Sequence, residues 1–187
     1  NADDVNRAVQ AAKGCYYQGP WGRMQPAERG RVITRIGDVI TKNAERLGEV
    51  ETRDNGKLPK NITPSLKSWQ TDSFYYYAGM CDKFEGSLLP TEVPDMLNYL
   101  RWEPFGVCAL ITAWNSPLGV LICKLAPALA AGNAVVIKPS EHASVSTLEL
   151  MSVLQEADLP AGLLNVVTGY GKSTGGLLVD HPDVRMV

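Results

Sequence analysis

The stretch VCALITAWNSPLGVLICKLAPALAAGNAVVIKPSE, residues 107–141, decides the fold class of this chain. It contains two short apolar runs, Val107–Ile111 and Ala134–Ile137, and a helical segment from Leu118 to Ala131 lies between them. Short apolar runs bounded by turn residues are typical of buried strands, and strands joined by a helix are typical of parallel pairing. The stretch therefore predicts a βαβ unit with a right-handed connection.

The same alternation continues downstream of this stretch. A helix is expected from Val145 to Ala157, a third apolar run occupies Leu163–Val167, and a last helix is expected from Lys172 to Val179. Strands that alternate with helices over this length predict an α/β fold, in which helices cover both faces of a parallel sheet.

The upstream half is predicted to be helical instead. Apolar residues recur at helical spacing in three segments, around Val5–Ala12, over Pro26–Leu47 and over Ser65–Cys81. Asp3 or Asp4 is placed to cap the first helix, and Asp54–Lys57 has the composition of a turn. Met96–Glu103 alternates between apolar and polar residues and predicts a strand. Helices first and βαβ units second is therefore the expected architecture.

Length, charge and hydropathy exclude several classes of protein. The 187 residues carry 18 Lys and Arg against 20 Asp and Glu and contain no basic block, which argues against nucleic-acid binding. The most apolar run, Leu118–Ala131, contains Lys124 and Pro127 and is shorter than the roughly 20 residues that span a bilayer. The polar start of the chain, NADDVNRAVQ, argues against a secretory signal. We therefore expect a soluble globular protein that has neither nucleic acid nor membrane as a partner.

The cysteines indicate a reducing compartment and no metal site. Cys15, Cys81, Cys108 and Cys123 are spread along the chain without a CxxC pair, and the chain has only 2 histidines. We expect reduced thiols, a cytoplasmic location and no bound metal.

Polar or glycine-rich residues follow each of the three apolar runs. They are residues 112–117 after the first run, 138–141 after the second and 168–172 after the third. Because ligands of parallel α/β sheets bind outside the carboxyl ends of the strands, these segments predict one shared site.

Lys138 and Glu141 flank the turn at the end of the second run. A lysine donor and a glutamate acceptor at this place can hold both hydroxyls of a ribose, and the carboxylate would repel a 2′-phosphate and so favour NAD over NADP. The alternative is that Ser140 caps the next helix while Lys138 and Glu141 are merely solvated. The residues by themselves leave both readings open.

The other two segments carry weaker signals. Residues 169–175, GYGKSTG, place glycines between a strand and a helix in a loosened dinucleotide-binding pattern, although a plain tight connection has the same composition. A phosphate-binding P-loop is excluded because Val166 stands where that motif needs glycine. Asn115 can donate a hydrogen bond to a developing oxyanion. A turn or helix cap before Pro117 is the interpretation of Asn115 that the residues alone favour.

These segments resemble motifs of the aldehyde dehydrogenase superfamily, in the same order along the chain. The motifs are ITAWNSPL (111–118), KLAPALAAGN (124–133), KPSE (138–141), LPAGLLNVV (159–167) and HPDV (181–184), preceded by AERG (27–30), DNGK (54–57) and YYAG (76–79). The resemblance covers essentially the whole chain. It implies a Rossmann-like parallel sheet with flanking helices, within an incomplete NAD-binding domain that has a helical lead-in over 1–95 and a βαβ portion over 96–187.

The resemblance also implies roles for individual residues. Asn115 would be the side-chain half of the oxyanion hole, and Lys138 and Glu141 would hold the adenosine ribose of NAD. The cofactor cleft would be lined by Ile111, Thr112, Ala113, Trp114, Ser140, Gly171 and Gly175. The implied reaction oxidises an aldehyde to its carboxylic acid: a cysteine thiolate attacks the carbonyl, hydride passes to NAD, and a glutamate-activated water releases the thioester.

Several positions depart from the family pattern. Ala113 replaces the usual proline and Ser116 the usual phenylalanine, while Gly119, Val120 and Cys123 are smaller than the residues often found there. If Ser116, Gly119, Val120 and Cys123 line the substrate tunnel, as in the family, that tunnel is wider or more polar than average. We therefore expect a bulky or polar aldehyde as the substrate.

The chain matches only the leading portion of the family pattern. It reaches Val187 just before the family's FTGS turn, and none of its cysteines matches the motif of the nucleophile. We expect the catalytic domain to lie outside these residues, and the 187 residues alone to be inactive and marginally stable. The family suggests a homo-oligomer. A non-catalytic relative that kept only the fold, and an acyl-transferring or semialdehyde-reducing relative on the same scaffold, remain open as alternatives.

Overall fold

A parallel sheet of three strands lies at the centre of the computed structural model, which describes residues 1–187. Strands β3 (Val107–Ile111), β4 (Ala134–Lys138) and β5 (Leu164–Val166) pair in the order β3-β4-β5. The register sets Ile111 beside Lys138, so the carboxyl ends of the strands meet at one edge. The predicted parallel sheet is confirmed, and the predicted strand bounds differ from the observed ones by one residue at most.

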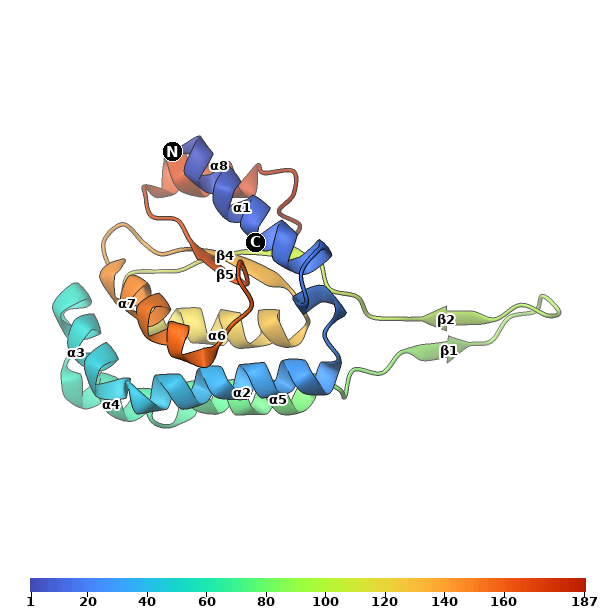
Figure 1. The fold of residues 1–187 in the computed structure, drawn as a ribbon, viewed down its shortest axis with the longest axis horizontal. Helices are drawn as coiled ribbons and strands as arrows, with labels where there is room; N and C mark the ends of the chain where they lie inside the picture. Colours follow the sequence, from blue (N-terminus) through green and yellow to red (C-terminus); the bar gives the residue numbers. More distant parts are fainter.

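Helices cover both faces of this sheet, as the sequence predicted (Figure 1). On one face lie α6 (Pro117–Ala130) and α7 (Val145–Val153), and α7 tightens into a 3₁₀ turn, η2 (Leu154–Ala157). On the other face lie α1 (Ala2–Tyr17) and the short α8 (Gly176–Val179), which a single π turn, η3 (Gly171–Gly175), precedes.

The upstream half packs as a second helical layer outside α6. It contains η1 (Trp21–Arg23), α2 (Pro26–Lys42), α3 (Ala44–Asn55), α4 (Pro59–Leu66) and α5 (Trp69–Met80). Helices α2 and α5 lie side by side, and α5 packs against α6 (Figure 1). This arrangement places the helical half beside the first turn of α6, the helix that follows the candidate oxyanion residue.

Two of the predicted helices are each divided into two. The single helix expected over Pro26–Leu47 is two helices, because the backbone of Asn43 leaves the helical region and its side-chain amide donates to the carbonyl of Val39 at 2.9 Å. The helix expected over Ser65–Cys81 is the end of α4 followed by α5, because the backbone of Ser68, with φ −138° and ψ −118°, lies outside the helical region.

The cap of α1 is also different from the prediction. Asn1, and neither Asp3 nor Asp4, is the N-cap, and its side-chain oxygen accepts a hydrogen bond from the backbone N–H of Asp4 at 3.1 Å. Asp4 completes a capping box from the third position of the helix.

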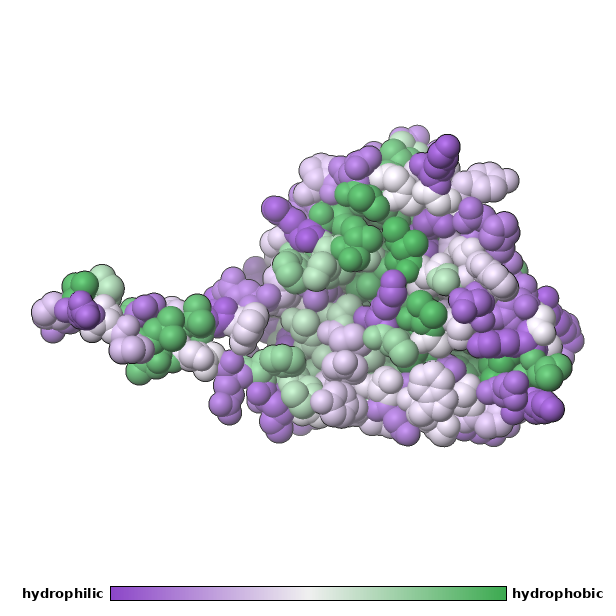
Figure 2. Space-filling model, turned by 180° about the vertical axis from the view of Figure 1, so that it is seen from behind, coloured by the Kyte–Doolittle hydropathy of each residue, from purple (hydrophilic) through white to green (hydrophobic).

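A long hairpin extends away from the rest of the molecule (Figure 1). Its strands β1 (Ser87–Leu89) and β2 (Asn98–Leu100) pair antiparallel, so the strand expected over Met96–Glu103 exists but is shorter. Apolar side chains such as Leu88 and Leu97 are exposed on it. Figure 2 shows hydrophobic patches on the protruding arm. A two-stranded ribbon with exposed apolar side chains has little to stabilise it by itself.

One apolar core of 38 buried residues joins the helical half to the sheet. Trp21 is fully buried, and its indole N–H donates to the carbonyl of Asn133, 112 residues away, at 3.1 Å. None of the helices combines the length and the apolar character needed to cross a bilayer.

Candidate functional site

The three loops that follow the strands are linked to one another at the carboxyl edge of the sheet. The backbone N–H of Thr112 donates to the carbonyl of Lys138 at 3.1 Å, and the N–H of Val167 donates to the carbonyl of Ile137 at 2.9 Å. The N–H of Gly171 donates to the carboxylate of Glu141 at 3.4 Å. The structure therefore brings the three predicted segments together at one place.

Lys138 is a buried cation at the end of the central strand. Its residue is 1% exposed, and its ammonium donates to the carbonyl of Pro139 at 2.8 Å and lies 3.5 Å from Glu141. Its methylene stem lies against Gly175, where an added Cβ would meet Lys138 Cδ at 3.6 Å and Cε at 3.7 Å. We call Lys138, Glu141, Gly171 and Gly175 the Lys138 cluster.

The carboxylate of Glu141 stands at the solvent-facing end of this cluster, with its side chain 31% exposed. Hydrogen bonds from its own backbone N–H and from that of Gly171, followed by the charge of Lys138, hold the pKa of Glu141 below its usual value. Its charge is therefore maintained at neutral pH, and its position is fixed from two sides.

The alternative reading of Ser140 as a helix cap is wrong. Helix α7 begins at Val145 with Ser144 as its N-cap, and Ser140 instead accepts a hydrogen bond from the backbone N–H of His142 at 3.3 Å. The first turn of α7 is satisfied by Asp54 of α3, which accepts from the N–H and the hydroxyl of Ser146 at 2.8 and 2.9 Å.

The chain needs glycine at position 169 to turn from β5 into the π turn. Gly169 has a φ of +145°, and a Cβ there would come within 2.1 Å of the hydroxyl of Thr174. This strain explains the first glycine of the loosened dinucleotide pattern. Gly171 is exposed at the start of the π turn and Gly175 is buried at its end.

The segment expected to line a cofactor cleft runs from the end of β3 to the start of α6. Ile111 is half-buried, whereas Ala113 and Trp114 are exposed. Thr112 is buried, and its hydroxyl oxygen has no hydrogen-bond partner in the chain. The hydroxyls of Thr41, Thr52 and Thr147 are also buried without a partner, so this feature alone does not mark a ligand position.

Asn115 is exposed at the end of this segment. The N-cap of α6 is Ser116, so the reading of Asn115 as the helix cap is wrong. We call residues 112–116 the Asn115 loop. Behind the loop, the ammonium of Lys124 donates to the carbonyl of Ile111 at 2.7 Å.

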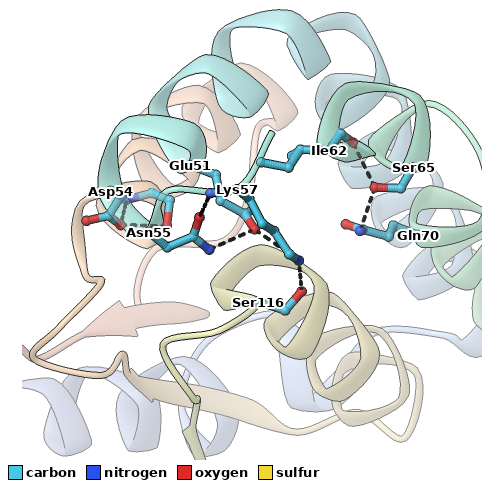
Figure 3. A network of polar contacts seen from close by, with 9 residues as sticks. Glu51, Asp54, Asn55, Lys57, Ile62, Ser65, Gln70 and Ser116 are labelled. Atoms are coloured by element: carbon cyan, nitrogen blue, oxygen red, sulfur yellow. Dashed lines mark hydrogen bonds and ion pairs between the residues drawn. The ribbon is translucent and has the colours of Figure 1, made fainter. Parts of the chain in front are cut away.

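Sequence reasoning missed the contacts that reach this loop from α3. The ammonium of Lys57 donates to the hydroxyl of Ser116 at 2.8 Å and lies 3.7 Å from the carboxylate of Glu51 (Figure 3). In the sequence, Lys57 is marked only as part of a turn, and no pattern marks Glu51. Nothing in the sequence marks a pairing across 59 residues.

The four positions expected to line a substrate tunnel share one face of the first turns of α6. Ser116 and Val120 are half-buried, Gly119 is buried and Cys123 is exposed. A Cβ at Gly119 would come within 2.8 Å of the hydroxyl of Ser116 and 3.4 Å of the amide nitrogen of Gln70. The small residue therefore lets α5 approach α6 closely at this point.

Three of the four thiols of this chain are buried, which disfavours the thiolate form that nucleophilic chemistry needs. Burial raises the pKa of Cys15 and of Cys108 to about 11, and it also raises the pKa of Cys81. Cys123 is the one exposed thiol. No group of three or more His, Cys, Asp or Glu side chains is placed to hold a metal ion.

The whole sequence, residues 1–187, matches the Aldehyde dehydrogenase family. It is 43% identical to the (Z)-2-((N-methylformamido)methylene)-5-hydroxybutyrolactone dehydrogenase of Acinetobacter baylyi, over 99% of this chain and 38% of that protein. It is 40% identical to the mitochondrial aldehyde dehydrogenase of Sus scrofa, over 99% of this chain and 36% of that protein.

Solved structures give the same result. The NAD-dependent aldehyde dehydrogenase from Sinorhizobium meliloti superposes with a TM-score of 0.92 at 36% identity, over 98% of this chain and 36% of that one. The NAD⁺ complex of an aldehyde dehydrogenase from Bacillus cereus gives the same TM-score and identity, over 98% of this chain and 37% of that one. The chain thus spans 36% to 38% of the length of these four proteins.

Proposed function

This chain belongs to the aldehyde dehydrogenase family, and from that premise we propose that the full-length protein carrying it oxidises an aldehyde to a carboxylic acid with NAD. The observation that carries the proposal is the linkage of the Asn115 loop to the Lys138 cluster through the hydrogen bond from Thr112 to Lys138. It supports the proposal because the loop that carries Asn115 and the strand end that carries Lys138 lie at the same edge of the sheet. Two relatives that are named as aldehyde dehydrogenases match this chain over 36% of their own length.

The residues of the Lys138 cluster fit NAD. Lys138 offers donors and Glu141 an ionised acceptor, which together suit the two hydroxyls of a ribose. The buried hydroxyl of Thr112, which has no partner within the chain, adds a further polar group at the same edge. Bound NAD supplies the hydride acceptor. The negative charge of Glu141 disfavours the 2′-phosphate of NADP, which supports NAD as the cofactor.

Asn115 supplies the proposed catalytic group of this chain. Its side-chain amide would donate to the oxyanion that forms when a cysteine thiolate attacks the aldehyde carbonyl, and such donors stabilise the transition state. The three buried thiols of this chain have raised pKa values, which supports a nucleophile from outside these residues. We therefore propose that the 187 residues alone are inactive.

A bulky or polar aldehyde is the proposed substrate class. At the start of α6, Ser116 stands where the family has phenylalanine and Cys123 is exposed, and the hydroxyl of Ser116 is held in place by Lys57. Gly119 adds no free space, because Ser116 and Gln70 lie against it. The Acinetobacter relative is named for a substituted hydroxybutyrolactone, a polar molecule larger than acetaldehyde.

A homo-oligomer in the cytoplasm is the proposed setting. The exposed apolar side chains of the β1–β2 hairpin support burial against another surface, and the four free cysteines support a reducing compartment. The mass of the full-length protein by light scattering tests the first proposal, and cell fractionation tests the second.

The deciding experiment measures NADH formation by the full-length protein with a panel of aldehydes, from acetaldehyde to hydroxylated and aromatic ones. We expect turnover with NAD⁺ and the highest kcat/KM with a bulky or polar aldehyde. If acetaldehyde gives the highest kcat/KM, the substrate proposal is wrong. If the protein binds NAD⁺ but oxidises no aldehyde, the non-catalytic alternative replaces the enzyme.

A further inference from the structure

The hydroxyl of Ser116 does not cap the helix that this residue begins. A serine at the N-cap normally accepts a hydrogen bond from a backbone N–H in the first turn. Ser116 makes no such bond to α6, and its hydroxyl accepts from the ammonium of Lys57 at 2.8 Å instead (Figure 3). The start of α6 is thus anchored to a residue that lies beyond the end of α3.

Lys57 is itself held in place from several sides. Gly56, with a φ of 80°, ends α3 in the left-handed conformation and turns the chain toward α6. The side chain of Asn55 accepts from the backbone N–H of Lys57 at 3.0 Å and donates to Glu51 at 3.4 Å. Lys57 keeps its side chain 39% exposed, whereas that of Glu51 is 3% exposed.

Glu51 is a buried charge that faces both Lys57 and α6. Burial raises the pKa of Glu51, while the charge of Lys57, the amide of Asn55 and the backbone amide of Leu118 each favour its ionised form. A buried ion pair adds little stability on average, because desolvation offsets the attraction. What such a pair does supply is one defined geometry for the groups that it joins.

The Asn115 loop is short and is held at both ends. At one end the backbone N–H of Thr112 donates to the carbonyl of Lys138. At the other end Ser116 is held by Lys57. Only residues 113–115 lie between these two attachments, so the place of the Asn115 amide depends on both of them.

We infer that Glu51 and Lys57 are positioning residues for Asn115: through Ser116 they hold the Asn115 loop where the amide of Asn115 reaches the developing oxyanion. This inference rests on the proposed function, because it assigns Asn115 to the oxyanion. It adds two residues from the helical half to the machinery of the site. Neither of them needs to touch the substrate.

A double-mutant cycle in the full-length protein tests the coupling between Lys57 and Asn115. We expect Lys57→Met to lower kcat by roughly tenfold, since a small misplacement of a reacting group has effects of this size or larger. The KM for NAD⁺ should stay unchanged, and Lys57→Arg should restore most of the rate because it keeps a charged donor. In an Asn115→Ala background, Lys57→Met should cause no further loss of kcat.

The outcomes separate the inference from the proposed function. If the two losses multiply in the double variant, Lys57 does not act through Asn115 and the inference fails. If Asn115→Ala leaves kcat unchanged, the assignment of Asn115 to the oxyanion fails instead.

A second measurement does not depend on activity. Hydrogen exchange of the segment 112–120, followed by mass spectrometry in the full-length protein, should be several-fold faster in Lys57→Met than in the wild type. The exposed Lys60 provides a matched control, and Lys60→Met should exchange at the wild-type rate. Unchanged exchange in Lys57→Met overturns the inference whatever the activity is.

Discussion

The Lys138 cluster and the Asn115 loop lie at the same edge of the sheet, but the chain holds them by different means. In the Lys138 cluster, Lys138 pairs with Glu141 three residues later, and Gly171 and Gly175 come from the loop after the adjacent strand β5. The Asn115 loop takes one support from the sheet and the other from Lys57, 59 residues before Ser116.

This difference predicts different responses to mutation. The Lys138 cluster is built from a tight turn and from neighbouring strands, so its geometry should persist wherever the sheet persists. The Asn115 loop also needs the packing of the helical half against α6. Changes in α3 should therefore affect chemistry at Asn115 and leave cofactor binding intact.

The largest expected effect is at Asn115. Asn115→Ala in the full-length protein should lower kcat by roughly 10²- to 10³-fold, as the loss of one oxyanion donor does in other enzymes. The affinity for NAD⁺, measured by fluorescence titration, should not change. A loss of NAD⁺ affinity equal to the loss of kcat would mean that the loop and the Lys138 cluster are not separate.

Glu141→Gln tests the other side of the comparison and should have a smaller effect. We expect the ratio of kcat/KM for NADP⁺ to that for NAD⁺ to rise by about tenfold, because the charge that repels a 2′-phosphate is removed. Since backbone N–H groups hold the pKa of Glu141 below 4.5, the wild-type preference for NAD should persist as the pH falls from neutral to 4.5. Unchanged discrimination in the variant would refute the role of Glu141.

Glu51→Gln should lower the activity that depends on the Asn115 loop without lowering the stability of the protein. We expect kcat to fall about threefold, because Lys57 is less firmly held, while the unfolding midpoint stays equal to or above that of the wild type. Because burial raises the pKa of Glu51 above 4.5, the folded state binds this proton more readily than the unfolded state.

The pH dependence of this stability difference has a defined sign. Any advantage of Glu51→Gln should be greatest at neutral pH and should shrink as the pH falls toward 4.5, where the wild-type carboxyl becomes protonated. Thermal unfolding of the wild type and of Glu51→Gln, at neutral pH and near pH 4.5, measures the difference in stability. An advantage that grows on acidification would contradict the assignment of a raised pKa.

The smallest effect is expected for the thiols. Among the four cysteines of this chain, iodoacetamide at neutral pH should modify only Cys123, because it is exposed whereas burial raises the pKa of Cys15, Cys81 and Cys108. Peptide mapping of the native protein measures this selectivity. Labelling of Cys108 at a rate similar to that of Cys123 would show that the sheet opens readily.

The α/β class, the strands β3 and β4 to within one residue, and the polar segments that follow them could all be predicted from the amino-acid sequence. These features follow from short-range patterns. A buried parallel strand is apolar along its length, and the loop after its carboxyl end is where ligands bind. The same patterns did not reveal the break at Asn43 or the capping of α1 by Asn1, because each depends on one local hydrogen bond.

The distant residues that support the site are apparent only in the folded chain. Asp54 satisfies the first turn of α7, and Lys57 holds Ser116, from positions 92 and 59 residues away. A lysine in a turn looks the same in sequence whether it is solvated or faces a buried carboxylate. Its partner is chosen by the packing of α3 against α7 and of α5 against α6, and that packing depends on the whole core rather than on neighbouring residues.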